Sequence, residues 1–154
     1  MRRWEVIADL INKHGYKTIA EIGIARGDTA RYVLENCDIT YYLMVDPQPR
    51  ESYIEKILED YPQSRWKKET SEVASMHCDN NFDLIFIDAL HDYDHIKQDI
   101  ELWLPKIKQG GVICGHDYNN TRFPGIARAV NEIFAYQLIT LIPVRRCQMW
   151  IKYV

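Results

Sequence analysis

The stretch FDLIFIDALHDYDH, residues 82–95, decides how this chain folds. Residues 82–87 are almost all large and apolar, which is typical of a strand buried on both faces of a parallel sheet. Asp88 stands where the apolar run stops, and a cluster of carboxylates and imidazoles follows it. Ligands of open α/β sheets bind at the carboxyl ends of the strands. Because burying unpaired ionisable groups is costly, so many of them at this point indicate a functional site.

The composition is that of one globular domain. The chain has 154 residues, of which 47% are hydrophobic and 27% charged, so it can bury a single core. The net charge is −3, which provides no general basic field to attract nucleic acid. We interpret the scattered basic pairs as solvated surface. They are Arg2-Arg3, Lys67-Lys68 and Arg145-Arg146.

Cysteine usage and the amino terminus predict a cytoplasmic protein. The four cysteines lie far apart without a CxxC pair, which favours buried, reduced thiols over a disulfide scaffold or a zinc module. The amino terminus, MRRWEVIADLINKHG, is basic and then amphipathic, and it lacks the long apolar run of a signal peptide or a membrane span. We therefore expect no membrane partner. The cysteines are Cys37, Cys78, Cys114 and Cys147.

Strand and helix patterns alternate along most of the chain. Expected strands cover 17–23, 41–46, 65–68, 82–87 and 110–117, and expected helices cover 1–15, 28–37, 53–61, 93–104 and 125–136, with a short one from Thr70 or Ser71. The last two strands, 137–142 and 146–153, have no helix between them and must be antiparallel. The sequence therefore predicts an α/β fold. It is a Rossmann-like, doubly wound, mostly parallel seven-stranded sheet with a C-terminal antiparallel hairpin and helices on both faces. Domain 1–154 would comprise an N-terminal helix (1–15), a cofactor and metal core (16–136) and a closing hairpin (137–154).

The loop after the first expected strand, EIGIARG at residues 21–27, is the first candidate site. Its glycines allow a tight turn and a close approach to a ligand, and the following helix presents free N–H groups. The loop is not a GxGxxG dinucleotide fingerprint, because Ala25 replaces the middle glycine. A tight turn without a ligand remains the alternative.

Two further positions are typical of a nucleoside site. Asp46 ends the second expected strand, where a carboxylate can accept hydrogen bonds from both ribose hydroxyls. The alternative is a turn-forming residue before Pro47. Thr70 and Ser71, which follow Glu69 after the third strand, are placed to line an adenine pocket, and capping of the next helix explains them equally well.

The motifs ExGxxxG, VDP, FIDxxHxY and GGVIxxHD, in this order and spacing, resemble a class I S-adenosylmethionine-dependent methyltransferase. Within that superfamily the chain is similar to the small O-methyltransferases grouped with the macrocin and mycinamicin enzymes and the cephalosporin-hydroxylase-like proteins. The resemblance covers roughly Ile19 to Val130. Its most specific part is FIDALHDYDHIKQDIELWLPKIKQGGVICGHDY, residues 86–118.

This resemblance implies S-adenosyl-L-methionine as cofactor and a role for each matching residue. The acidic and glycine positions of the first loop would contact the methionine part, Asp46 the ribose, and His91 would be the base that deprotonates the acceptor, beside Asp88. The metal ligands would be Asp88, His116 and Asp117. The whole set of cofactor contacts would be Glu21, Gly23, Ala25, Gly27, Asp46, Thr70, Ser71 and Asp88.

Methyl transfer to a hydroxyl group requires such an arrangement on chemical grounds, independently of the resemblance. An alcohol is a poor nucleophile at neutral pH, and a metal that binds its hydroxyl together with a nearby imidazole base would activate it. Asp88 and Asp117 end neighbouring expected strands, so their carboxylates can converge and suit magnesium or manganese. His116 would shift the preference toward manganese, iron or zinc. The alternatives are a backbone-bonded His116, an Asp117 that caps the next turn, and a His91 on the surface.

We therefore predict a methyltransferase that moves a methyl group to a hydroxyl of a small molecule, for example a sugar or glycosylated product. Loop 119–125, with Arg122 and Phe123, is the candidate for acceptor contacts. Little chain precedes the first strand, so we expect either an open acceptor site or a homo-oligomer in which a second subunit completes it.

Two rival functions belong to other classes. A catalytically silent relative would bind the nucleoside as an interaction subunit, and Leu90, where many relatives carry an acidic residue, favours it. A nicotinamide-dependent Rossmann enzyme is the other rival. The missing GxGxxG fingerprint and the terminal hairpin count against it.

Overall fold

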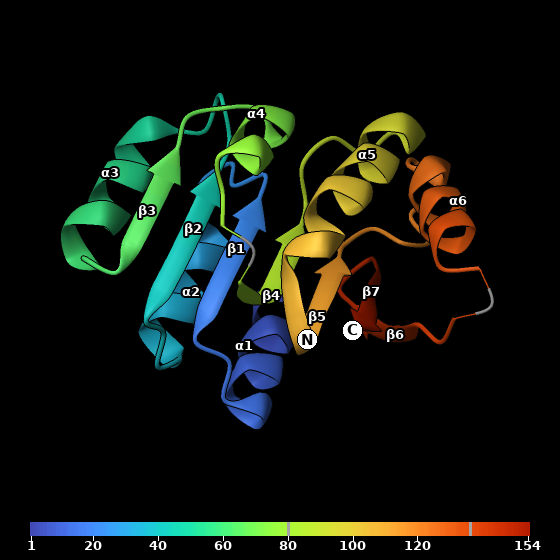
Figure 1. Cartoon of the computed structure of the whole chain (residues 1–154), viewed down its shortest axis with the longest axis horizontal. Helices are drawn as coiled ribbons and strands as arrows, with labels where there is room; N and C mark the ends of the chain where they lie inside the picture. Colours follow the sequence, from blue (N-terminus) through green and yellow to red (C-terminus); the bar gives the residue numbers. More distant parts are fainter. Residues whose placement is uncertain (80, 136) are drawn as a thin grey trace.

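The computed structural model describes residues 1–79, 81–135 and 137–154, and within them seven strands form one sheet with helices on both faces (Figure 1). The helices are α1 Arg3–His14, α2 Asp28–Asn36, α3 Glu51–Asp60, α4 Ser71–Met76, α5 Tyr93–Trp103, the 3-10 turn η1 Leu104–Lys106 and α6 Pro124–Ile133. The strands are β1 Thr18–Ile22, β2 Tyr41–Val45, β3 Ser64–Lys67, β4 Phe82–Ile87, β5 Ile107–Gly115, β6 Thr140–Val144 and β7 Cys147–Tyr153.

The sheet has the order β3-β2-β1-β4-β5-β7-β6. Strand β1 pairs in parallel with β2 on one side and with β4 on the other, and β5 continues the parallel part. Strand β7 is antiparallel to both β5 and β6, so the predicted mostly parallel sheet with a C-terminal antiparallel hairpin is confirmed. The chain crosses over between β1 and β4, and the crevice at such a switch point is where open α/β sheets bind ligands.

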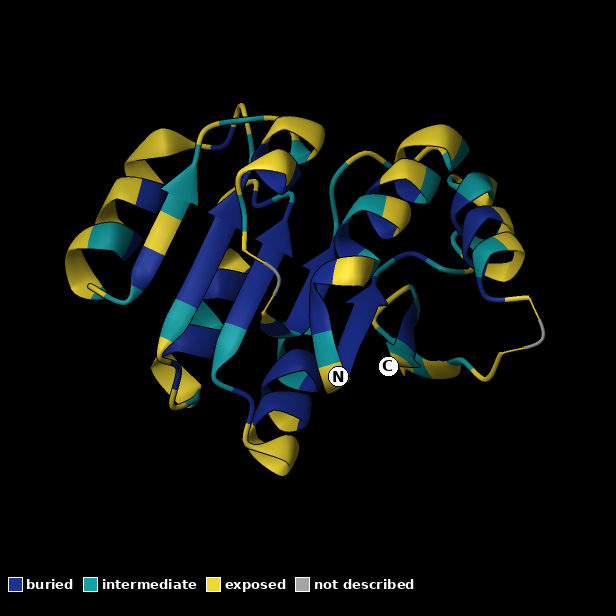
Figure 2. Cartoon of the chain, viewed as in Figure 1, coloured by how far each residue is buried: buried dark blue, intermediate teal, exposed yellow. Residues whose placement is uncertain are grey.

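Two hydrophobic clusters, one on each face of the sheet, hold the helices in place. Helices α1, α2 and α3 pack on one face through Ile7, Val33 and Ile54, and α5 and α6 pack on the other. From Leu84 to Ile87, successive residues of β4 alternate between the clusters, as the pleat of a strand requires. Figure 2 shows the consequence, with buried central strands and exposed residues on the outer faces of the helices.

The alternation along β4 also fixes where its last residue points. Leu84 and Phe86 lie in the cluster on the α1 face, and Asp88 is the next position in that series. The Asp88 amide still donates to the carbonyl of Ile22, so the extended pairing continues to the site. The strand therefore presents the Asp88 carboxylate toward the amino end of α1.

Some expected boundaries were wrong. Strand β5 begins at Ile107 rather than at 110, because its first residue pairs with Phe82 and the register then shifts by a bulge that includes Gly110. Strand β6 begins at Thr140 rather than at 137 and extends through Pro143, which an edge strand tolerates. Helix α6 ends at Ile133, and Tyr136, the expected end, lies outside the described residues.

Among the described residues, no helix is both long enough and apolar enough to span a membrane.

Candidate active site

The glycine-containing loop after β1 is packed against the end of β4. Gly23 has φ 86°, and a Cβ atom there would lie 2.4 Å from the carbonyl oxygen of Asp88. Gly27 has φ 74°, and a Cβ atom there would lie 2.5 Å from Cδ1 of Ile57. Only glycine meets both the backbone conformation and the space. The loop therefore lies directly against the backbone of Asp88 and Ala89, at the end of β4.

Asp46 holds this loop from the neighbouring strand. Its Oδ2 accepts hydrogen bonds from the amides of Ile24 at 2.9 Å and Ala25 at 3.1 Å. Its Oδ1 accepts one from the amide of Gln48 at 2.8 Å, which is the turn-forming role. A carboxylate offers about four lone-pair positions and three accept these amides, so one position on Oδ1 remains for a ribose hydroxyl. The ribose contact stays a prediction.

The residues that follow β3 differ in whether their side chains already have hydrogen-bond partners within the fold. Thr70 caps α4 by accepting from the Val73 amide at 3.3 Å, and Ser71 accepts from the indole of Trp103 at 2.8 Å. By contrast, the Oε2 atom of Glu69 is buried without a hydrogen-bond partner among the described residues. The adenine contacts predicted for Thr70 and Ser71 stay predictions. Among the described residues, Oε2 of Glu69 is the acceptor atom of this segment that the fold does not use.

Glu21 is a buried carboxyl group at the end of β1. It is 2% exposed and accepts a hydrogen bond from the Tyr42 hydroxyl at 2.8 Å. Burial raises the pKa of Glu21 to about 8, against the opposing effects of Tyr42 and the nearby Arg3. Glu21 is therefore largely protonated at neutral pH, and a cationic ligand group beside it would favour the charged form.

The ionisable groups after β4 and β5 converge as the sequence predicted. Nε2 of His91 lies 3.4 Å from Oδ1 of Asp88 and 3.3 Å from Oδ2 of Asp117. Nδ1 of His116 lies 3.1 Å from Oδ2 of Asp117 and 4.0 Å from Oδ1 of Asp88. Asn120 donates to the other oxygen of Asp117 at 2.8 Å. Through these contacts His91 belongs to the cluster, so the alternative of a plain surface histidine does not apply.

The charges of the cluster are tightly coupled. Burial raises the pKa of Asp117, but hydrogen bonds from His116, His91 and Asn120 outweigh it and hold that pKa far below its ordinary value. Hydrogen bonds to Asp117 and Asp88 raise the pKa of His91 to about 9. His91 therefore carries a proton between the two carboxylates at neutral pH.

The donor set fits a divalent cation. Asp88, His91 and Asp117 each offer one ligand atom, and these atoms lie within 4.8 Å of one another. His116, Asp117 and Cys147 form a second such group, with Sγ of Cys147 3.1 Å from Nε2 of His116. Two carboxylates with imidazole nitrogens suit manganese or magnesium, and the thiolate extends the range toward zinc. Neither group contains all three predicted ligands, because Asp88 is grouped with His91, and His116 with Cys147, although Nδ1 of His116 lies 4.0 Å from Oδ1 of Asp88. The ligand set and the metal itself stay predictions.

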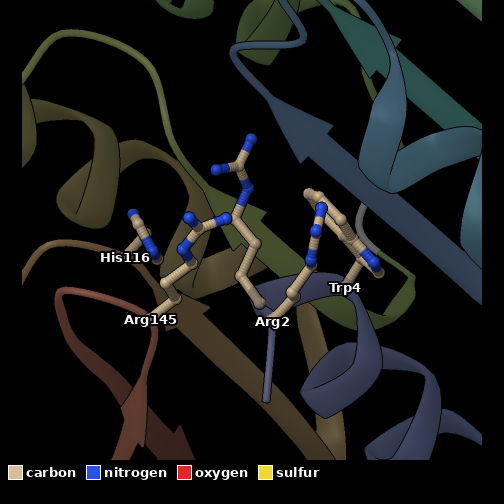
Figure 3. A pocket seen from close by; sticks show the side chains of 5 residues that line it. Arg2, Trp4, His116 and Arg145 are labelled. Carbon is tan, nitrogen blue, oxygen red and sulfur yellow. The ribbon is translucent and has the colours of Figure 1, made fainter.

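Sequence reasoning missed Arg3 as a residue of this site, where its Nε lies 3.3 Å from Oδ2 of Asp88. Phe123, which belongs to the predicted acceptor loop, stacks on His91 with ring centroids 4.5 Å apart. Arg2, Arg145 and Arg146 are exposed, in agreement with the interpretation of these pairs as solvated surface, and Arg3 is half-buried. Arg2, Arg3 and Arg145 line one cavity with Trp4 and His116 (Figure 3). The only signal in the sequence was the pairing of basic residues.

A second cavity, of about 440 Å³, lies on the other side of His91. Its lining includes Arg122 and Phe123 of the predicted acceptor loop. The full lining is His91, Asp92, Tyr93, Arg122, Phe123, Pro124 and Gly125.

The sheet order, the reversed β7 and the site at the β1–β4 switch point define a class I methyltransferase fold. A family model described as "Methyltransferase domain" matches residues 20–118, and the chain belongs to that family. The matched segment contains every cofactor, metal and catalytic residue predicted from the sequence. The assignment to the class I S-adenosylmethionine-dependent methyltransferases is thereby confirmed.

Solved structures agree on the fold. A proposed O-methyltransferase from Klebsiella pneumoniae superposes with a TM-score of 0.81 at 18% identity, covering 99% of this chain and 79% of that one. The Bacillus cereus O-methyltransferase in complex with SAH gives 0.75 at 17% identity, covering 97% and 79%. The O-methyltransferase TomG from Streptomyces achromogenes, in complex with SAM, gives 0.77 at 14% identity, covering 97% and 78%.

A curated relative is similar over a shorter stretch. An uncharacterized protein of Acanthamoeba polyphaga mimivirus is 37% identical over 57 residues, which are 36% of this chain and 26% of that protein. The match thus spans about a quarter of the relative's length and carries no activity with it.

Proposed function

We propose that this chain is an S-adenosylmethionine-dependent O-methyltransferase that methylates a hydroxyl of a small molecule with the help of a divalent cation. The observation that carries the proposal is the convergence of Asp88, His91, His116 and Asp117 directly beside the Gly23 loop. The proposed cofactor site and the cluster that would activate the acceptor therefore lie next to each other. Direct transfer of a methyl group between two bound molecules requires this proximity. The names of the solved neighbours from Bacillus cereus and Streptomyces achromogenes support O-methylation.

In this proposal the residues of β1, β2 and their loops bind the cofactor. Glu21 would attract the cationic methionine end, the turn at Gly23 would admit its backbone, and Asp46 would bind the ribose hydroxyls. When bound, the cofactor supplies a methyl group on its sulfonium sulfur. The buried Oε2 of Glu69, which has no hydrogen-bond partner within residues 1–79, 81–135 and 137–154, supports a polar contact to the adenine.

The residues after β4 and β5 would orient and deprotonate the acceptor. Asp88, His116 and Asp117 would hold magnesium or manganese, which would position the hydroxyl and lower its pKa. His91 must lose the proton that its pKa of about 9 retains before it can act as a base. A bound cation would neutralise the charges of Asp88 and Asp117, and these charges are what raises the pKa of His91.

Cofactor binding is tested by titration calorimetry with S-adenosylhomocysteine. The wild-type protein is expected to bind in the micromolar range, and Asp46→Ala to bind at least about tenfold more weakly, because hydrogen bonds to a charged group are lost. Asp60→Ala, which removes a surface carboxylate paired with Lys56 at the end of α3, is the control and should bind like the wild type. No binding by the wild type, with or without Mg²⁺ or Mn²⁺, would contradict the enzyme proposal.

Metal binding is tested by titrating Mn²⁺ and following its electron paramagnetic resonance signal. Asp117→Asn is expected to weaken Mn²⁺ binding by at least about tenfold, since a carboxylate ligand becomes a neutral amide. Asp94→Asn, which changes an exposed carboxylate at the start of α5, should leave it unchanged. Equal loss in both variants would point to diffuse surface charge instead of a site.

The second candidate is the catalytically silent subunit. Leu90 is 56% exposed, so at the position where relatives carry an acid the described structure presents an apolar side chain. Cofactor binding without methyl transfer to any hydroxylated compound would favour this candidate. Leu90→Asp would then be the variant in which to look for restored metal binding.

Two predictions about the setting of the protein remain proposals. All four cysteines are free thiols and only Cys114 is fully buried, which supports a reducing, cytoplasmic environment. A homo-oligomer that completes the acceptor site is tested by measuring the mass in solution with and without S-adenosylhomocysteine.

A further inference from the structure

Three distant parts of the chain line a small open cavity that borders the ionisable cluster at His116. Arg2, Arg3 and Trp4 come from the start of α1, His116 from the end of β5, and Arg145 from the turn between β6 and β7. Figure 3 shows His116, Arg145, Arg2 and Trp4 arranged around it. The cavity has a volume of about 130 Å³. A hydrogen bond from the Arg145 amide to the Met1 carbonyl, at 3.1 Å, ties the first and the last of these parts together.

The arginines of this cavity bring several positive charges close together. Arg3 is paired with Asp88, but within the described residues no acidic side chain forms a salt bridge with the guanidinium of Arg2 or of Arg145. The Arg2 and Arg3 guanidinium groups lie 5.1 Å and 5.6 Å from the ring centroid of Trp4, which holds them near each other. The amino end of α1 adds its partial positive charge. Such an arrangement favours an anion.

The cavity borders the ionisable cluster through His116. His116 is both part of its lining and 3.1 Å, through Nδ1, from Oδ2 of Asp117. An anionic group held by Arg2 and Arg145 would therefore lie a few bonds away from a hydroxyl placed between Asp88 and Asp117. Guanidinium groups bind carboxylate and phosphate oxygens in pairs, so they would fix the orientation of the acceptor as well as its affinity.

We propose that the cavity formed by Arg2, Trp4, His116 and Arg145 binds a negatively charged group, a carboxylate or a phosphate ester, of the methyl acceptor. The inference rests on the proposed O-methyltransferase function and narrows its substrate class to hydroxylated organic anions. The cavity, of about 130 Å³, has room for an anionic group between the arginines. The cavity beyond His91 has room for the remainder of the acceptor.

The test uses inorganic phosphate and malonate as probes on the metal-free full chain, with and without S-adenosylhomocysteine. Binding is followed by calorimetry and by the NMR signals of the arginine Nε–H groups. Arg145→Gln and Arg2→Gln are expected to weaken binding of the preferred probe by about tenfold each, because a charge-assisted hydrogen bond is lost. Arg146→Gln is the matched control, since it removes the same charge from the next residue of the same turn, and Arg146 is not part of the lining.

The outcomes separate this proposal from the proposed function. Selective loss in Arg145→Gln and Arg2→Gln, with unchanged S-adenosylhomocysteine affinity, supports an acceptor site, and the better probe tells phosphate from carboxylate. An equal loss in Arg146→Gln, or no saturable binding of either probe, overturns it. If Arg145→Gln instead weakens S-adenosylhomocysteine, the cavity serves the cofactor's own carboxylate and the acceptor proposal is wrong. Failure of the wild type to bind S-adenosylhomocysteine contradicts the proposed function separately.

Discussion

Gly23→Ala is expected to destabilise the protein by roughly 3–5 kcal/mol and to abolish S-adenosylhomocysteine binding. The φ of 86° disfavours any side chain, and the new Cβ would lie 2.4 Å from the Asp88 carbonyl oxygen and 2.5 Å from Cα of Ala89. Both atoms belong to backbone at the end of β4, so the clash moves the strand end that presents the Asp88 carboxylate. Urea denaturation and calorimetry measure the two effects.

Gly110→Ala separates backbone strain from the clash. Gly110 has a similar φ of 83°, but a Cβ atom there meets nothing within 4 Å. We expect only the left-handed backbone cost, about 1–2 kcal/mol, and unchanged ligand binding. If both variants lost the same stability, the close approach of the Gly23 loop to β4 would not be a packing constraint.

The fold was predictable because its signals are local or depend only on strand order. The almost entirely apolar run of β4 indicated a central parallel strand, and the short link between the last two strands required an antiparallel pair. The start of β5 was not predictable. It depends on a bulge opposite Phe82, which is a property of the paired strands and not of residues 107–110 alone.

The site was predictable where chemistry follows the ends of strands. Asp88 and Asp117 follow β4 and β5, which are neighbours in the sheet, so the expected strand order was enough to infer that their carboxylates converge. The arginine cavity could not be inferred in this way. Arg2 and Arg145 meet because the start of α1 lies against the β6–β7 turn, and no periodicity in the sequence encodes that contact.

Glu21 should make the ligand-free protein less stable as the pH rises. Its pKa is about 8 in the folded protein and 4.5 ordinarily, so the folded state binds the proton more tightly than the unfolded state. The resulting stability is fully present below pH 4.5 and is lost as the pH rises through about 8. The loss over that window is roughly 3–5 kcal/mol. Glu21→Gln stays neutral at every pH, so this variant is expected not to lose that stability as the pH rises. Urea denaturation at a series of pH values measures the difference from the wild type.

The same substitution should weaken cofactor binding, which identifies why a charged group is buried there. Glutamine cannot balance a cationic methionine end, so S-adenosylhomocysteine should bind at least about tenfold more weakly to Glu21→Gln although the protein is more stable at pH 8. Asp99→Asn is the comparison for stability only, because burial raises the pKa of Asp99 to about 6 and its side chain hydrogen-bonds Ser71, a predicted adenine contact. Asp60→Ala, at the surface of α3, is the control for ligand binding. A Glu21→Gln variant that gained stability and kept full affinity would show that this carboxyl does not contact the cofactor.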